Sequence, residues 1–120
     1  MPSSKNFFIA LQKFVNGKDL LTLYYNEAKK NAPFPYGVIS DPNESLLKYG
    51  NQVFFDILIW SKDPITGLKL EEITEQLIAL LDRHIFSEQR AVIYFESQKP
   101  VSDPEFELVK KKLTFSVRIF

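Results

Sequence analysis

The sequence predicts an α+β fold, in which a small, mostly antiparallel sheet carries two helices packed on one face. Two segments space their apolar residues as amphipathic helices do, one ending near Asn16 and one over residues 68–85. Five segments are instead rich in β-branched and aromatic residues, as strands are: 20–25, 36–40, 51–61, 90–96 and 106–120. Because these strands mostly follow one another along the chain, antiparallel pairing is the economical arrangement. A length of 120 residues accommodates one domain, so residues 1–120 are expected to form a single unit.

The first expected helix begins at a serine cap, Ser3 or Ser4. Its apolar residues fall three and four positions apart and form one stripe: Phe7, Phe8, Leu11, Phe14 and Val15. Asn16-Gly17 is expected to end the helix in a left-handed conformation. Residues 20–25 are short and apolar, so helix and strand are both possible there. Three residues of high strand propensity favour the strand: Thr22, Tyr24 and Tyr25.

Prolines mark the next segment. Pro33 and Pro35 flank an aromatic residue and hold the chain extended, and residues 36–40 follow as the second expected strand. Residues 41–43, Asp-Pro-Asn, form a turn. The loop at residues 44–50 is more apolar than a free loop needs to be. We expect it to fold over the sheet or to order against a partner through three side chains: Leu46, Leu47 and Tyr49.

The central strand, residues 51–61, is apolar on both faces. Alternation places one set of side chains on the first face: Val53, Phe55, Ile57 and Ile59. The second face carries a set that is also mostly apolar: Phe54, Asp56, Leu58 and Trp60. A strand of this kind is usually buried on both faces. We therefore expect the domain core to cover one face and another copy of the chain to cover the other.

The second half of the chain contains the clearest helix. Residues 62–67 are a connector, and residues 68–85 then carry a core-facing stripe that extends to Ile85. Arg83 and His84 at the expected end of this helix suit its dipole. Residues 98–105 contain two prolines and an Asp-Pro turn. The last strand, or strand pair, is interrupted by Lys110-Lys111-Lys112, which we interpret as a solvated hairpin tip rather than a nucleic-acid patch.

Composition argues against several classes of function. Fifteen basic and fifteen acidic residues cancel, which leaves no electrostatic case for nucleic-acid binding. The chain has no cysteine, so disulfides and Cys-ligated metals are excluded, and a single histidine cannot form a multi-His metal site. No apolar run reaches the roughly 18 residues of a membrane span. A signal peptide is not expected either.

The side chains that could carry chemistry have simpler explanations. His84 fits a surface residue at a helix end, and the Glu71-Glu72 and Glu75 cluster fits a solvated helix face. Asp56, between apolar neighbours, could act as an acid or base. Pairing with a cross-strand Lys or Arg such as Arg118, or a place in a subunit contact, is the favoured interpretation. We find no nucleophile elbow and no phosphate-binding loop, so the sequence predicts no enzyme, no cofactor and no metal.

Three segments together indicate a family. They are Pro35-Tyr36-Gly37-Val38-Ile39, Tyr49-Gly50-Asn51-Gln52-Val53 at the start of the central strand, and Asp56-Ile57-Leu58-Ile59-Trp60-Ser61 at its end. With the helix before them and the helix and strand pair after them, the chain resembles the tail-completion, tail-terminator or head-to-tail joining proteins of long-tailed bacteriophages. The resemblance covers residues 4–120. Residues 20–35 depart from the family pattern because that stretch is long and rich in Lys.

The resemblance implies a mixed α/β fold and a hexameric ring on the end of the tail tube. Such a ring stops tube polymerisation and presents a surface to the head-completion or connector protein. The implied partners are other copies of this chain, the tail-tube protein and that head protein, while DNA passes through the lumen without specific binding. The implied location is the neck of the virion tail, after assembly in the host cytoplasm, with no membrane involved.

The expected interface follows from the surplus of apolar residues, because self-association would bury it. We predict that it contains Phe54, Asp56, Leu58, Trp60, Leu46, Leu47 and Tyr49. The alternative is a small α+β adaptor that acts through a sheet edge, or a ligand-binding or enzymatic domain with an Asp56-centred pocket that also uses His84.

Overall fold

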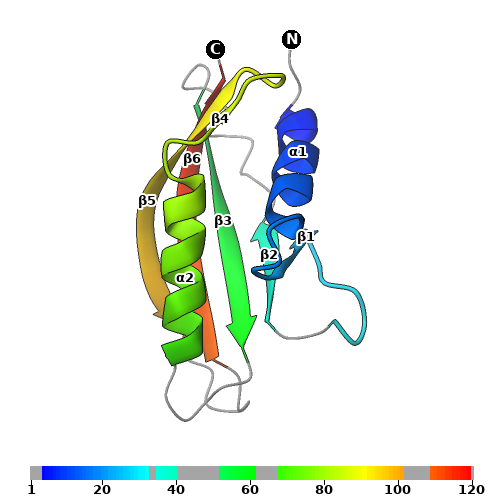
Figure 1. Cartoon of the computed structure of the whole chain (residues 1–120), viewed down its shortest axis with the longest axis vertical. Helices are drawn as coiled ribbons and strands as arrows, with labels where there is room; N and C mark the ends of the chain where they lie inside the picture. The colour runs from blue at the N-terminus through cyan, green and yellow to red at the C-terminus, as the bar shows by residue number, and fades with distance from the viewer. Residues whose placement is uncertain (1–3, 33–34, 41–51, 62–67, 102–108, 120) are drawn as a thin grey trace.

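The computed structural model describes residues 4–32, 35–40, 52–61, 68–101 and 109–119 (Figure 1). Within them the chain forms the helices α1 (Ser4–Asn16) and α2 (Leu68–Leu81). The strands, in chain order, are β1 (Thr22–Tyr25), β2 (Tyr36–Ser40), β3 (Gln52–Ser61), β4 (Ile85–Phe86), β5 (Ala91–Val101) and β6 (Val109–Ile119).

The strands form one sheet in the order β1-β2-β3-β6-β5-β4. β1 and β2 pair in parallel, and every other neighbouring pair is antiparallel. Figure 1 shows both helices in front of the sheet, with α1 beside β1 and β2 and α2 over β5 and β6. The predicted α+β fold, a mostly antiparallel sheet with two helices packed on one face, is therefore confirmed.

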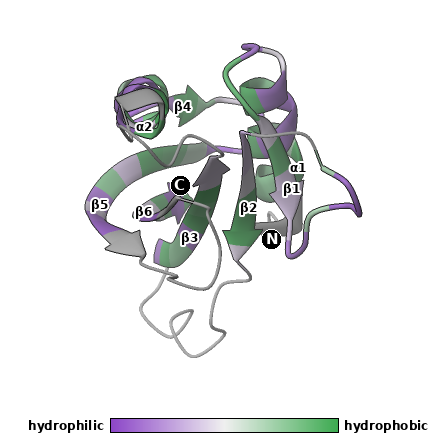
Figure 2. Ribbon diagram, turned by 90° about the horizontal axis from the view of Figure 1, so that it is seen from below, coloured by the Kyte–Doolittle hydropathy of each residue, from purple (hydrophilic) through white to green (hydrophobic). Residues whose placement is uncertain are grey.

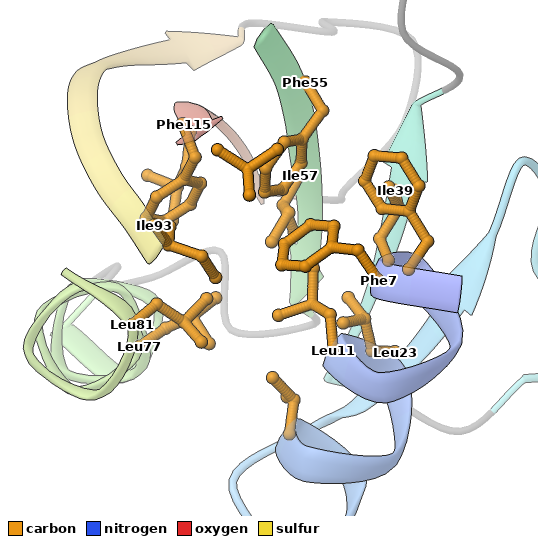
Figure 3. Packing of buried hydrophobic residues seen from close by; sticks show 14 of the residues in the cluster. Phe7, Leu11, Leu23, Ile39, Phe55, Ile57, Leu77, Leu81, Ile93 and Phe115 are labelled. Carbon is orange, nitrogen blue, oxygen red and sulfur yellow. The ribbon is translucent and has the colours of Figure 1, made fainter. Parts of the chain in front are cut away.

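One face of β3 forms the centre of the core. Its side chains are at most 3% exposed: Val53, Phe55, Ile57 and Ile59. α1 contributes Phe7, whose ring meets the ring of Phe55 edge-on with centroids 5.9 Å apart. α2 contributes Leu77 and Leu81 from the other side (Figure 3). Each side chain of this size stabilises the fold by about 1.5–3 kcal/mol when it is fully buried.

α1 ends at Asn16, as predicted, but the residue predicted to take the left-handed conformation was wrong. Gly17 has no positive φ, and its N–H still donates to the carbonyl of Lys13 at 3.1 Å. The first positive φ after the helix is 56°, at Asp19. Asp visits this region more readily than most residues because its short side chain can bond locally. The left-handed turn therefore comes two residues later than the sequence indicated, although the helix ends where it was predicted to end.

α2 is shorter than predicted, because it ends at Leu81 rather than at Ile85. Arg83 has a φ of 63°, and its N–H donates to the carbonyl of Ile93 at 2.6 Å. The chain then turns so that β4 pairs with the start of β5 and Phe86 is buried against α1. The apolar residues keep the spacing of a helix as far as Ile85, but the backbone there pairs with β5 instead. The two basic residues predicted in the last turn therefore follow the helix.

The lysine run lies inside β6, so the predicted break and hairpin tip were wrong. Lys111 occupies a core-facing position of the strand, where it is 8% exposed and its ammonium pairs with the Glu71 carboxylate of α2. Lys112 lies on the opposite face, because side chains alternate along a strand. Strand pairing with β3, rather than the charge of the run, decides where these side chains go.

β5 is longer than predicted and runs through Pro100 to Val101. β4 pairs only with Ala91 and Val92, so Pro100 lies on a part of β5 that has no described strand beyond it. Proline is tolerated at such an edge because its missing N–H breaks no ladder bond.

Several predicted features lie outside the described residues: Pro33, the 41–43 turn, the 44–50 loop with Leu46, Leu47 and Tyr49, the 62–67 connector and the Asp-Pro turn at residues 103–104. Neither helix in the described part of the chain combines the length and the hydropathy that crossing a membrane requires.

Candidate interaction surface

The face of the sheet opposite the helices, here called the outer face, carries all the β3 residues predicted for the interface. In Figure 2 the helices lie above the sheet and the outer face lies below. Phe54, Asp56, Leu58 and Trp60 are each half-buried, in strict alternation with the core residues of β3. The structure therefore brings these four side chains together on one face. The other three predicted residues, Leu46, Leu47 and Tyr49, lie outside the described residues.

An aromatic row crosses three strands at one end of the outer face. The ring of Tyr36 on β2 stacks on Trp60 of β3, with centroids 5.2 Å apart and ring planes 21° apart. Tyr24 on β1 meets Tyr36 edge-on at 6.1 Å. Aromatic pairs of this kind add about 0.5–1.5 kcal/mol to the burial of their area. Sequence reasoning missed the two tyrosines as surface residues, since only the register places them beside Trp60.

Apolar side chains extend the aromatic row along β2 and β3. Val38 lies directly opposite Leu58 in the β2–β3 register, and it is 6% exposed. Phe54 lies further along β3 on the same face. The part of the outer face formed by β1, β2 and β3 is thus apolar and aromatic, although no described helix covers it.

Asp56 sits where the apolar part of the outer face meets the polar part. Its Oδ1 accepts a hydrogen bond from the Thr114 hydroxyl at 2.7 Å, and its Oδ2 lies 3.6 Å from the Lys112 ammonium. The favoured prediction, that Asp56 pairs with a cross-strand cation, is confirmed. The example given for that cation was wrong, because the register places Arg118 opposite Gln52 and Lys112 beside Asp56.

His84 lies on the helix side of the sheet, away from Asp56. Its ring stacks on Phe14 of α1 with centroids 4.3 Å apart, and Phe86 meets it edge-on at 4.8 Å. The structure therefore does not bring Asp56 and His84 together into the site that the enzymatic alternative requires. Among the described residues, no group of three or more His, Asp or Glu side chains is placed to hold a metal ion.

The polar part of the outer face, formed by β5 and β6, contains a groove of about 500 Å³. Side chains from β3, β5, β6 and the turn after α2 line it: Gln52, Asp82, Arg83, Tyr94, Phe95, Glu96, Ser116 and Arg118. Asp56 is not among them, so this groove is not the Asp56-centred pocket of the alternative. No sequence pattern marked the groove, since its lining comes from four separate segments.

The β1 edge of the sheet is closed by amide side chains of α1. The Asn16 side chain accepts a hydrogen bond from the Leu23 N–H at 2.7 Å and donates one to the Leu23 carbonyl at 3.3 Å. Gln12 donates a second bond to the same carbonyl at 3.0 Å. These amides take the place of a neighbouring strand, so this edge is blocked against strand addition.

No protein-family model matches the chain, and no curated protein matches it in sequence.

Proposed function

We propose that this protein is a structural tail protein of a long-tailed bacteriophage or prophage. In this proposal it forms a ring, expected to be a hexamer, that caps the tail tube, stops its polymerisation and joins the tail to the head connector. It acts by binding and not by catalysis.

The observation that carries the proposal is the half-buried apolar and aromatic stripe on the outer face of β3. Phe54, Leu58 and Trp60 follow one another along ten strand residues, with the core on the opposite face. Contact with a second protein would bury their remaining exposed area, and burial of apolar area is the main favourable term in association. Aromatic residues such as Trp60 are also enriched among the residues that dominate binding energy.

The closed β1 edge favours face contacts over edge contacts at that side of the molecule. The β1 edge is occupied by Asn16 and Gln12, as described above. A neighbouring copy would therefore meet this side through side chains of the outer face rather than by adding a strand to β1. A heterologous contact of this type closes into a ring when the rotation between copies divides a full turn. The ring form itself comes from the family resemblance.

The proposed mechanism is mechanical. A ring that binds the last ring of tube subunits covers the growing end and leaves a lumen for DNA. Fifteen basic and fifteen acidic residues cancel, so the chain as a whole has no strong field to retain DNA during passage. The steps require no proton transfer, metal or cofactor.

The test uses tube subunits from the genome that encodes this chain. Purified tail-tube protein is polymerised with and without this protein, and the tubes are imaged by negative-stain electron microscopy. The proposal predicts shorter tubes that carry a ring at one end. Tubes of unchanged length with bare ends, at a molar excess of this protein, would contradict it.

A further inference from the structure

In the polar groove on β5 and β6, the acidic side chains have hydrogen-bond partners among the described residues and the basic side chains do not. Both carboxylates in its lining are engaged. Asp82 accepts a hydrogen bond from the Phe95 N–H at 2.9 Å, and Glu96 accepts one from the Ser116 hydroxyl at 3.3 Å. These bonds are internal to the fold, so the two acidic side chains form part of the wall of the groove.

The two arginines of the lining have no such partners. Within the described residues, neither Arg83 nor Arg118 forms an ion pair or a side-chain hydrogen bond. They come from different elements, since Arg83 belongs to the turn after α2 and Arg118 to β6. The unused binding capacity of the groove therefore consists of hydrogen-bond donors with positive charge. The Gln52 amide and the Tyr94 hydroxyl lie in the same lining and add further donors.

We propose that this groove binds a ligand through a carboxylate group, held by the guanidinium groups of Arg83 and Arg118. A guanidinium group presents parallel N–H donors that match the two oxygens of a carboxylate. The groove volume, about 500 Å³, falls within the range typical of small-molecule sites. This site is separate from the apolar stripe of β3 and does not depend on ring assembly.

The lining does not favour a phosphate over a carboxylate, because Asp82 and Glu96 offset the charges of Arg83 and Arg118. A phosphate monoester carries about 1.5 to 2 negative charges at neutral pH, whereas a carboxylate group carries one. Since a lining without net charge gives the more highly charged anion no advantage, the match between the two carboxylate oxygens and the parallel guanidinium donors decides the preference.

The experiment is a titration of the whole isotope-labelled protein with sodium succinate, followed by NMR at constant ionic strength. We expect saturable shifts in the Nε–H signals of Arg83 and Arg118 and in the backbone amides of Tyr94 and Ser116. Titration with N-acetylglutamate amide identifies the source of the carboxylate. Tighter binding of this compound indicates a protein side chain, and tighter binding of succinate indicates a free small acid.

Substitutions locate the site. Arg83→Gln and Arg118→Gln should each weaken succinate binding about tenfold, the factor that corresponds to the loss of a charge-assisted hydrogen bond. Arg90→Gln is the matched control, because Arg90 is also an exposed arginine with a positive φ, 53°, but it does not line the groove. It should bind as the wild type does. Arg118→Lys keeps the charge but lacks the paired donors, so it should fall between wild type and Arg118→Gln.

Three results would overturn the proposal. The first is a set of shifts that sodium chloride reproduces at the same ionic strength. The second is inorganic phosphate binding as tightly as succinate. The third is an equal loss of succinate binding in Arg90→Gln and Arg118→Gln. The dispersion of each variant's amide spectrum verifies that the variant is folded.

Discussion

At the scale of single residues, the hydroxyl of Thr114 has a hydrogen-bond partner and the buried hydroxyl of Thr74 has none among the described residues. Thr74 of α2 is 1% exposed, and within the described structure its hydroxyl makes no hydrogen bond. The Thr114 hydroxyl on β6 donates to Asp56. A buried polar group without a partner loses its contacts with water and gains nothing in return.

Replacing Thr74 by Val, which has nearly the same shape, should therefore raise the free energy of unfolding by about 1 kcal/mol. The matched substitution Thr114→Val should lower it by about 1 kcal/mol, because it removes a hydrogen bond to a charged acceptor. Urea unfolding followed by circular dichroism measures both values. A loss of stability in Thr74→Val equal to that in Thr114→Val would show that the Thr74 hydroxyl has a partner in solution.

The pairing of Lys111 with Glu71 gives a second prediction at this scale. The Lys111 side chain is 10% exposed, whereas the Glu71 side chain is 54% exposed, so water screens part of the attraction. Glu71→Ala should nevertheless lower the free energy of unfolding by about 1 kcal/mol, because it leaves a buried ammonium without its partner. Glu72→Ala, at an exposed neighbouring position of α2, is the control and should change stability by less than about 0.5 kcal/mol.

A double variant separates loss of the ion pair from loss of Glu71 itself. Lys111→Met fills the same core-facing position with an apolar side chain, so Glu71→Ala combined with Lys111→Met should recover most of the lost stability. If the double variant is less stable than Glu71→Ala alone, the lysine contributes independently of this pair.

At the scale of elements, the sequence predicted most of the helices and strands but placed several of their ends wrongly. α1 and β3 were predicted to within a residue, because their apolar spacing is long and regular. The end of α2 was wrong because Ile85 keeps the helical spacing while its backbone pairs with Val92 of β5. The pairing with β5 and the burial of Phe86 against α1 decided this end, and the apolar spacing within the helix does not reveal either contact.

The same limit applies to the candidate surface. Period-two alternation alone placed Phe54, Asp56, Leu58 and Trp60 on one face, as the structure has them. The partner of Asp56 depends on the register between β3 and β6, which the sequence does not reveal. The groove was missed for the same reason, since Arg83 and Arg118 come to line one groove only after α2, β5 and β6 are assembled.

The closure of the β1 edge by α1 leads to a prediction for these two elements. Asn16→Ala removes the side chain that bonds both the N–H and the carbonyl of Leu23. It should lower the free energy of unfolding by about 1–2 kcal/mol and speed hydrogen exchange of the Leu23 amide more than that of the core amides of β3. Mass-resolved or NMR-detected exchange measures this difference.

Asn6→Ala is the control for that experiment, because Asn6 is an exposed residue of the same helix, far from Leu23 in sequence. It should leave Leu23 exchange unchanged. Equal protection of Leu23 in wild type and Asn16→Ala would mean that the amide of Asn16 does not hold the edge strand.

At the scale of the whole molecule, exposed apolar side chains occur both in the proposed assembly surface and as single residues elsewhere. Ile9 on α1 is 42% exposed and stands apart from the outer face. Leu58 is half-buried in a patch that continues through Trp60 on β3 and Val38 on β2. Single exposed apolar residues are common on monomeric proteins, whereas continuous patches mark contacts with partners. We therefore assign assembly to Leu58 and its neighbours and not to Ile9.

Two matched substitutions test this assignment. Leu58→Glu places a carboxylate directly opposite Lys112 in the β3–β6 register, so the folded subunit gains a cross-strand partner while the stripe becomes charged. Ile9→Glu is the control, because it replaces an apolar side chain of the same size as Leu58 by the same glutamate on the surface of α1. We expect both variants to unfold at close to the wild-type temperature, with only Leu58→Glu defective in assembly.

The most direct measurement is size-exclusion chromatography with light scattering on the wild type and both variants, alone and with tail-tube protein. We expect the wild type and Ile9→Glu to reach the mass of a ring or to join the tube fraction. Leu58→Glu should keep the mass of one chain and elute apart from the tube. A wild-type protein that remains a single chain and ignores the tube at high concentration would contradict the account, as would a Leu58→Glu variant that assembles as well as Ile9→Glu.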